Sequence, residues 1–540
     1  MTTREDNNDY TTYIWVGESI EKLAQAFPTI FFIVAIFMSI MSMSRMALED
    51  RTEIGTLKAL GFSDIHIMMK YIIYSLLATI LGGVLGSIFG MHFLTRFVWQ
   101  MYQMLYNLPN YHLYFNPLII LIGILIAMIC ITGSTMLTIK SIIKESASSL
   151  MRPKAPKSIK NLFFEKTRIW KKIRFSNKVT IKNIIRYRKR VFMTVVGIMG
   201  CTILLLTGYG IRDSIVNIPT KQFDELFLYD DLIYYTNGYE YQEELLNSPH
   251  IKSKVEGKLV QATVGNLAVY LMGVEDYSTS NEIIKLHSIE NQEEIKLQDD
   301  EIVISSKLAS VNHLKKGDSI LVKTNDNKQY HFIIHDIFEN YVAHYIMMNK
   351  NTYQKEMGDY QINMTYIKMD DRKYENELTR ELMKNENVSM ILNVDNTREN
   401  INTMLKPLDS VVLILFAFSG VLSFVVLYNL SYINISERKR EIASLKVLGF
   451  YNREVDNYII KENFIITILG ILLGMILGKP FVNFIVSSIE MDFVQFLRMI
   501  TIQSYIKTFL YMLSFTMLVS ILIHFTLKKI NMIDSLKSVE

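Results

Sequence analysis

Seven apolar runs, each about as long as a membrane helix requires, constrain this chain more than any other feature. A helix needs about 20 consecutive, mostly apolar residues to cross the hydrocarbon core of a bilayer. The sequence therefore predicts a mostly α-helical polytopic membrane protein with about seven spans. The runs lie near residues 28–44, 67–98, 117–139, 191–210, 408–432, 459–488 and 505–527.

The chain also repeats itself. Residues 49–62 read EDRTEIGTLKALGF and residues 437–450 read ERKREIASLKVLGF, which are identical at eight of fourteen positions. The match continues without a gap into the apolar run that follows each copy. Glycines four residues apart place a small-residue groove on one helix face, so each triplet predicts close helix packing. The aligned glycines are Gly82, Gly86 and Gly90 in the first copy and Gly470, Gly474 and Gly478 in the second.

Charge is strongly segregated along the chain. Residues 140–190 carry seventeen Lys or Arg against two acidic residues, and residues 210–407 carry twenty-one against thirty-two. Because cytoplasmic loops are rich in Lys and Arg, the first region is predicted to lie in the cytoplasm. One span then separates it from residues 211–407, which places that segment outside the cell membrane. The C-terminus falls in the cytoplasm.

These signals divide the chain into six parts. The first unit looks like the second without its beginning, so we expect its missing first span to come from a longer chain or from another polypeptide. The parts are an external stub (1–27), a first membrane unit (28–140), a basic cytoplasmic linker with an amphipathic helix (141–190), a span (191–210), an extracytoplasmic domain (211–407) and a second membrane unit (408–540).

Residues 211–407 are predicted to form one α+β domain. Short segments rich in β-branched and aromatic residues are separated by turn signals such as Lys315–Asp318 and Asn325–Asn327. A helical pattern appears near 374–386. The predicted strands are 302–305, 319–323, 330–338 and 362–369.

Several function classes lack sequence support. No GxxxxGK[ST] motif is present to bind ATP phosphates, and no HExxH or serine nucleophile elbow suggests an enzyme. His331, His335 and His344 lack an accompanying acidic or cysteine cluster, so no metal site is predicted. Cys130 and Cys201 both lie in predicted spans and are interpreted as packing residues. The basic linker precedes a membrane span, which favours anionic lipid headgroups over nucleic acid.

The pattern resembles the FtsX-like permease family, the membrane subunits of ABC transporters of the macrolide-exporter and lipoprotein-releasing type. The resemblance rests on the repeated charged segment and on NIIRYRKRVFMTVVGIMG at 183–200. It extends to EIVISSKLASVNHLKKGDSI at 301–320. It implies a membrane-surface helix that contains Asn183, Arg186 and Arg190.

The resemblance also implies that each charged segment holds a coupling helix gripped by a dimer of separate ATPase subunits, which would bind ATP and magnesium. This chain would bind no cofactor of its own. A solvated helix–turn between spans is the simpler alternative for either copy alone. The implied coupling residues are Arg51, Glu53, Lys58 and Gly61 in the first copy and Lys439, Glu441, Lys446 and Gly449 in the second.

The leading hypothesis is therefore an ABC transporter permease in the cell membrane that works by mechanotransmission. Movement of its extracytoplasmic domain would export or extract an amphiphilic, lipid-linked or peptide substrate. One alternative is a signalling permease that regulates a cell-wall hydrolase or senses antimicrobial peptides. Another is a membrane scaffold without a motor, which would have no use for two docking segments. The sequence does not identify the substrate.

Overall fold

The structure is a computed structural model that describes most of the 540 residues. The described residues are 8–105, 114–151, 175–186, 188–236, 246, 249–265, 267–275, 282–437, 442, 444, 447, 449, 451–490 and 494–528. The chain forms two compact units, one built on a mixed sheet and one built on long helices.

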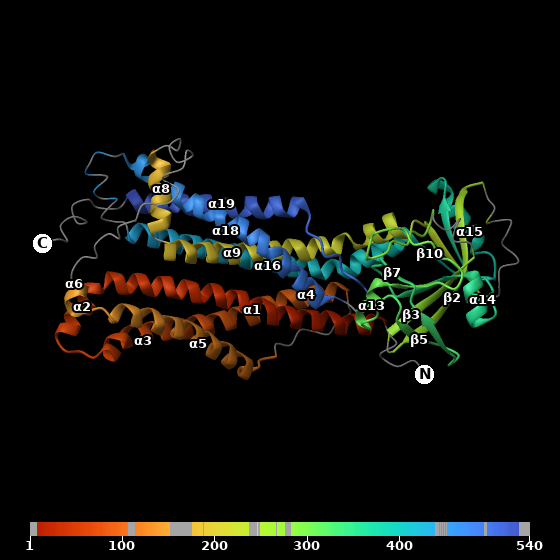
Figure 1. The fold of residues 1–540 in the computed structure, drawn as a ribbon, viewed down its shortest axis with the longest axis horizontal. Coiled ribbons are helices and arrows are strands. Elements are labelled where there is room, and N and C mark those ends of the chain that lie inside the picture. The colour runs from red at the N-terminus through yellow and green to blue at the C-terminus, as the bar shows by residue number, and fades with distance from the viewer. Residues whose placement is uncertain are drawn as a thin grey trace. The chain divides into compact units, whose positions relative to one another are not determined.

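Seven helices in the described residues are long and apolar enough to cross a membrane, which confirms the predicted number of spans (Figure 1). The stretches that qualify are Pro28–Glu49, Asp64–Gln100, Pro117–Ile143, Val191–Leu226, Val412–Asn429, Ile460–Ile489 and Ile502–Phe525. They lie on α1 (Asn8–Glu49), α3 (Asp64–Phe89) with η2 (Gly90–Leu94) and α4 (Thr95–Leu105), α5 (Pro117–Ile143), α9 (Arg188–Val216) with α10 (Ile218–Thr220) and η4 (Lys221–Leu226), α16 (Val394–Glu437), α18 (Asn452–Ile489) and α19 (Ile502–Lys528).

Three shorter helices complete the helical unit: α2 (Arg51–Ala59), α6 (Ala147–Met151) and α8 (Phe175–Arg186). A buried apolar cluster joins α2 and α6 to the ends of α1, α3 and α5. Such clusters stabilise helices that are too short to persist alone. The cluster consists of Met43, Ala47, Ile54, Ile67, Tyr71, Ile139, Ile143 and Leu150.

The second unit of the repeat is more tightly packed than the first. Of the residues in the most apolar 18-residue stretch of α18, 39% are buried. The corresponding fraction for its counterpart α3 is 11%. The helix α9 is the most enclosed, with 61% buried. It contacts α1 at Gly200 and Val34 and also packs against α16 and α18.

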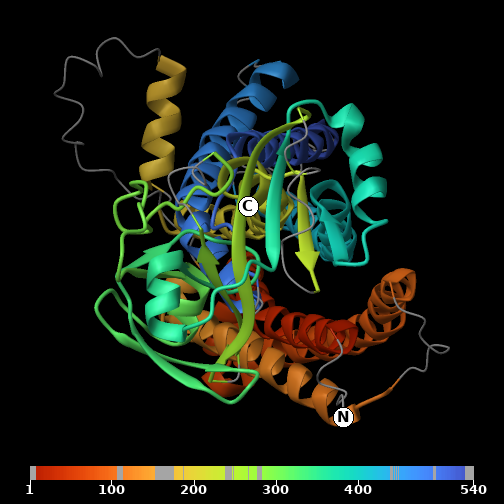
Figure 2. The same ribbon diagram turned by 90° about the vertical axis from the view of Figure 1, so that its right-hand side faces the viewer.

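The other unit is a mixed sheet of ten described strands with short helices beside it (Figures 1 and 2). Its main path runs β10-β1-β9-β2-β3-β8-β4-β7, and β5 pairs with β2 and β6. The strands are β1 (Asp231–Tyr235), β2 (Ile251–Val264), β3 (Leu267–Val274), β4 (Ile302–Ser305), β5 (Ser319–Thr324), β6 (Gln329–Ile333), β7 (Asp336–Phe338), β8 (Tyr345–Asn349), β9 (Met364–Met369) and β10 (Val388–Asn393). The helices are α13 (Ser306–Val311), α14 (Lys350–Met357), η5 (Arg372–Tyr374) and α15 (Glu375–Leu382).

Apolar residues of these strands form the sheet's core. Burial alternates along β5 but is continuous in β4 and in the middle of β8, and all three strands contribute to one cluster that includes Ile304, Val322 and Ile346. Strands β4, β5 and β9 and helix α15 lie where the sequence predicted them. The predicted strand 330–338 is split into two strands, because β6 pairs with β5 whereas β7 pairs with β4.

The compact unit that contains the sheet includes Arg212–Lys406 and, unexpectedly, Val486–Met499. The second segment is the end of α18 and the start of the connection to α19. Apolar side chains of this connection are buried, among them Val494, Phe496 and Leu497. A segment nearly 80 residues further along the chain thus forms part of the sheet unit.

A buried carboxyl gives this sheet unit a pH-dependent stability. Burial raises the pKa of Asp231 on β1 to about 6, above the ordinary 3.8, and the nearby charges of Glu375 and Asp230 act in the same direction. The Asn393 amide and the Arg372 guanidinium oppose the shift. Between pH 4 and 6 the folded protein thus holds a proton that the unfolded chain has released. The free energy of unfolding contributed by Asp231 therefore falls as the pH rises through this window.

We expect Asp231→Asn to stabilise the sheet unit above pH 6, by up to about 2 kcal/mol, because the amide carries no buried charge. At pH 4.5 the gain should be much smaller. Resistance of the detergent-solubilised full chain to proteolysis in urea, followed by fragments of the sheet unit, measures the difference. Equal effects at pH 4.5 and pH 7.5 would contradict the assignment.

Candidate functional site

The charged segment between the first two spans folds as the short helix α2, which has an inner and an outer face. Ile54 and Gly55 are buried on the inner face. Gly55 is required there, because an added Cβ would lie 2.8 Å from Met151 Cγ of α6. The inner face therefore holds α2 against its own chain and leaves the outer face open.

Two of the predicted coupling residues also belong to the inner face. Arg51 donates to Glu145 Oε2 at 2.5 Å and to the backbone oxygen of Ser149 at 2.8 Å. Lys58 donates to the backbone oxygen of Ile143 at 2.5 Å, which satisfies a free carbonyl at the end of α5. Lys58 thus fastens α2 to the end of α5, and Arg51 fastens it to α6 and to the turn before α6.

The outer face carries one acidic side chain and two apolar ones. Glu53 is exposed and forms an ion pair with Lys70 Nζ at 3.1 Å. The same lysine lies 3.0 Å from Asp50, which also accepts from the Tyr71 hydroxyl. Just beyond α2, Leu60 and Phe62 are 70% and 52% exposed. Two large apolar side chains are thus exposed near the charge network of Asp50, Glu53 and Lys70.

Gly61 permits the sharp end of α2. Its φ is +86°, in the left-handed region that other residues rarely adopt. The turn is closed by the bond from the backbone N–H of Phe62 to Leu57 O at 3.1 Å. In the second copy Gly449 has a φ of +92°. Lys439, Glu441 and Lys446 lie outside the described residues, whereas Val447 is described and exposed.

The two glycine triplets have different surroundings. A Cβ added to Gly470, Gly474 or Gly478 of α18 would lie 2.8, 2.6 or 2.7 Å from a side-chain atom of α9. The side chains met are those of Ile198, Thr202 and Leu206 respectively. A Cβ added to Gly82, Gly86 or Gly90 would meet no described atom within 4 Å. The first triplet therefore borders open space.

The connection from α18 to α19 is held to the sheet unit by polar contacts. Lys307 of α13 lies 3.0 Å from Glu490, and both side chains are less than 10% exposed. Glu490 also accepts from the backbone N–H of Phe496 at 2.8 Å and lies 3.6 Å from Arg498. Ser306 donates to the Gln495 side chain.

Backbone bonds add to this attachment. The N–H of Gln495 donates to Tyr341 O at 2.8 Å, and the N–H of Leu497 donates to Ser214 O at 3.1 Å. A bridge also pairs Val342 with Val494. We call Glu490 together with residues 494–499 the docking loop. Its ends lead into α18 and α19.

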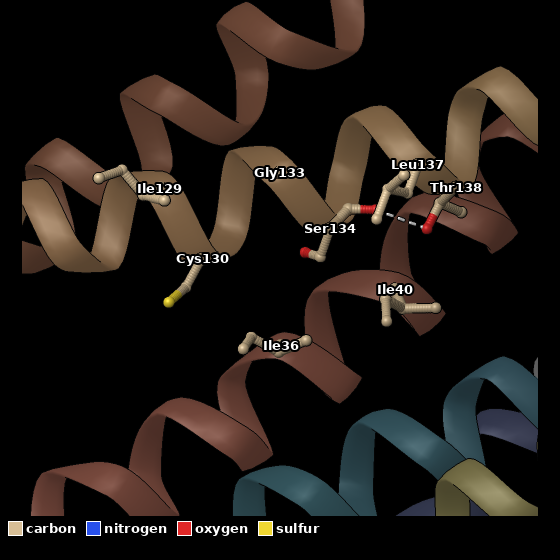
Figure 3. Close-up of a pocket in the computed structure, with 8 residues that line it drawn as sticks. All are labelled: Ile36, Ile40, Ile129, Cys130, Gly133, Ser134, Leu137 and Thr138. Atoms are coloured by element: carbon tan, nitrogen blue, oxygen red, sulfur yellow. Dashed lines mark hydrogen bonds between the residues drawn. The ribbon is translucent and has the colours of Figure 1, made fainter.

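A pocket of about 440 Å³ opens between α1 and α5 (Figure 3). Its lining is apolar apart from two hydroxyls and a thiol. Ser134 and Thr138 use their hydroxyls to bond backbone oxygens of α5 at 2.8 and 2.7 Å. The pocket therefore suits an apolar chain better than an ion. It is lined by Ile36, Ile40, Ile129, Cys130, Gly133, Ser134, Leu137 and Thr138.

The remaining candidates are the residues of the predicted membrane-surface helix and the histidines. Asn183 and Arg186 lie on α8 and Arg190 lies in the first turns of α9, but the side chains of Asn183 and Arg190 are outside the description. His335 lies 3.1 Å from Glu301. In the described part of the chain, no three His, Cys, Asp or Glu side chains form a group that could hold a metal.

Comparison with known proteins agrees with the repeat. A family model described as the FtsX-like permease C-terminal domain matches residues 26–147 and, separately, 413–532. Both membrane units thus contain a segment that matches the FtsX-like permease C-terminal domain, and residues 211–407 lie between the two matched segments in the sequence.

Solved structures that are similar to this chain each match about a third of it. The periplasmic region of MacB from Actinobacillus actinomycetemcomitans is 15% identical, with 33% of this chain and 94% of that chain covered and a TM-score of 0.22. The extracellular domain of the noncanonic ABC-type transporter YknZ from Gram-positive bacteria is 13% identical, with 30% and 99% covered and a TM-score of 0.22. A putative lipoprotein from Bacillus anthracis is 11% identical, with 30% and 96% covered and a TM-score of 0.19. No curated protein matches the sequence.

Sequence reasoning identified Glu53 but missed the exposed apolar residues Leu60 and Phe62 and the residues of the docking loop. Leu60 and Phe62 have a signal in the sequence, because LGF ends both copies of the repeat. The Lys307–Glu490 pair had no sequence signal, since 183 residues separate its members.

Proposed function

We propose that this permease couples ATP hydrolysis by a separate ATPase dimer to movement of its extracytoplasmic domain. ATP binding would draw the two ATPase subunits together beneath the charged segments of the two units. The spans would tilt, and the extracytoplasmic domain would change shape. This cycle would export or extract an amphiphilic, lipid-linked or peptide substrate.

The attachment of the docking loop to the sheet unit is the main support for this proposal. Besides the covalent connections through α9 and α16, the buried Lys307–Glu490 pair ties the sheet unit to the junction of α18 and α19. A domain that only binds a ligand outside the cell needs no such tie. A domain driven by the spans does.

The outer face of α2 supports the coupling role. Arg51 and Lys58 fix the helix to its own unit, so a force applied to Glu53, Leu60 and Phe62 is transmitted to the spans. The laterally open, apolar pocket between α1 and α5 supports an amphiphilic substrate, because its lining has no charged side chain. The proposal also places both charged segments in the cytoplasm.

Reversal of the acidic residue in both copies tests the coupling. We expect Glu53→Lys with Glu441→Lys to reduce ATPase co-purification and permease-dependent ATP hydrolysis at least ten-fold, because a docking charge changes sign in each copy. Because Glu53 pairs with Lys70, the control adds Lys70→Glu and restores the local ion pair with reversed polarity. Full rescue by that control, or unchanged ATPase binding in the double variant, would contradict docking at Glu53 and Glu441.

A further inference from the structure

The uncovered glycine face of α3 has a covered counterpart in the same chain. Gly82, Gly86 and Gly90 correspond in the repeat to Gly470, Gly474 and Gly478. Contact with α5 does not use the triplet, because the glycine of α3 that meets α5 is Gly83, whose added Cβ would lie 2.8 Å from Ile124. The triplet therefore remains accessible while α3 packs against α5.

The covered copy shows what such a face accepts. Along α18, the glycines receive Ile198, Thr202 and Leu206 of α9. Both series rise by four residues per contact in the same chain direction, so the two helices run parallel. The ridge consists of branched side chains at i, i+4 and i+8, and the groove lets the two backbones approach closely.

The low burial of α3 is consistent with an unoccupied place for a neighbouring helix. Only 11% of the apolar stretch of α3 is buried, against 39% for α18, although the two segments match in sequence. Large side chains next to the glycines are exposed, including Leu81, Leu85 and Phe89. Identical glycine spacing with unequal cover indicates a helix-binding face that the described chain leaves empty.

We propose that the Gly82–Gly86–Gly90 face binds a transmembrane helix of a second polypeptide, parallel to α3. That helix carries Ile, Thr, Leu or Val at every fourth position, as α9 does. It takes the place beside α3 that α9 takes beside α18. This inference rests on the two glycine triplets and is independent of ATP coupling.

The experiment uses a synthetic helix copied from α9 as the probe. The peptide spans residues 188–216 with Cys201→Ala and Thr202→Cys. The full permease, with Cys130→Ala, Cys201→Ala and Gly86→Cys, is placed with the peptide in lipid nanodiscs and oxidised. A disulfide needs Cα atoms about 4.4–6.8 Å apart, which only close helix contact provides. A Cβ at position 86 meets no described atom within 4 Å, so the variant leaves the fold of α3 intact.

We expect the Gly86→Cys variant to form at least ten times more cross-linked product than either of two matched variants. Leu85→Cys tests another face of α3, and Gly123→Cys tests an open glycine of α5. Ile198→Trp in the peptide should abolish the cross-linked product of the Gly86→Cys variant, because the larger side chain does not fit the glycine groove. Equal yields from all three variants would mean that lipid covers the face and would overturn the proposal. A permease dimer, cross-linked through position 86 of two copies and not displaced by the peptide, would assign the face to a second copy and would overturn it as well.

Discussion

Replacing Leu60 and Phe62 together by Asp is expected to abolish ATPase binding while leaving the permease folded. Both side chains are exposed and lie outside the spans, so they contribute little to internal packing. Apolar anchors at the centre of a protein interface each contribute about 2 kcal/mol or more to binding. Loss of two anchors should therefore weaken ATPase binding by at least a hundred-fold. Co-purification at several ATPase concentrations measures the shift.

A matched control separates a docking effect from a general effect of exposed charge. Ile333 on β6 is 70% exposed, as Leu60 is, but lies in the extracytoplasmic sheet unit. Ile333→Asp should leave ATPase binding unchanged. If Leu60→Asp with Phe62→Asp retains wild-type binding, or if Ile333→Asp impairs it equally, the outer face of α2 is not the docking surface.

Replacing Glu490 by Met is expected to detach the docking loop and uncouple the extracytoplasmic domain. The change leaves Lys307 buried without its carboxylate partner and removes the acceptor for the Phe496 N–H. Breaking one side of a buried pair costs about 3–5 kcal/mol. Protease sensitivity of residues 494–499 should rise, and transport should fall more steeply than ATPase activity.

The reciprocal variant gives a graded comparison. Lys307→Met should cost less than Glu490→Met, because Arg498 lies 3.6 Å from Glu490 and still compensates its charge. The double variant Lys307→Met with Glu490→Met should recover part of the stability, since no buried charge remains unpaired. Equal losses in the two single variants, or additive losses in the double variant, would show that the pair does not act as a unit.

Much of this architecture could be predicted because it depends on local composition. The spans follow from runs of apolar residues, which must bury their backbone polar groups in helices. Strands β4, β5 and β9 follow from β-branched patterning between turns. The left-handed turns at Gly61 and Gly449 follow from the repeated LGF, since glycine adopts positive φ at little cost.

The roles of individual charges could not be predicted in the same way. Arg51, Glu53 and Lys58 are equally polar in the sequence, yet Arg51 and Lys58 bond the chain between the end of α5 and α6, and only Glu53 faces outward. Which side of α2 is buried depends on where α6 packs, and α6 lies almost 90 residues away. Residue type alone contains no information about that neighbour.

The sequence by itself determined the membrane class, the repeat and the family resemblance, because each is a matter of order and spacing along the chain. Only the tertiary structure decided that the α18 glycines are filled and the α3 glycines are open, and that Glu490 lies against Lys307. The physical reason is that packing is a relation between segments distant in sequence. Identical local patterns therefore acquire different roles according to which neighbour occupies them.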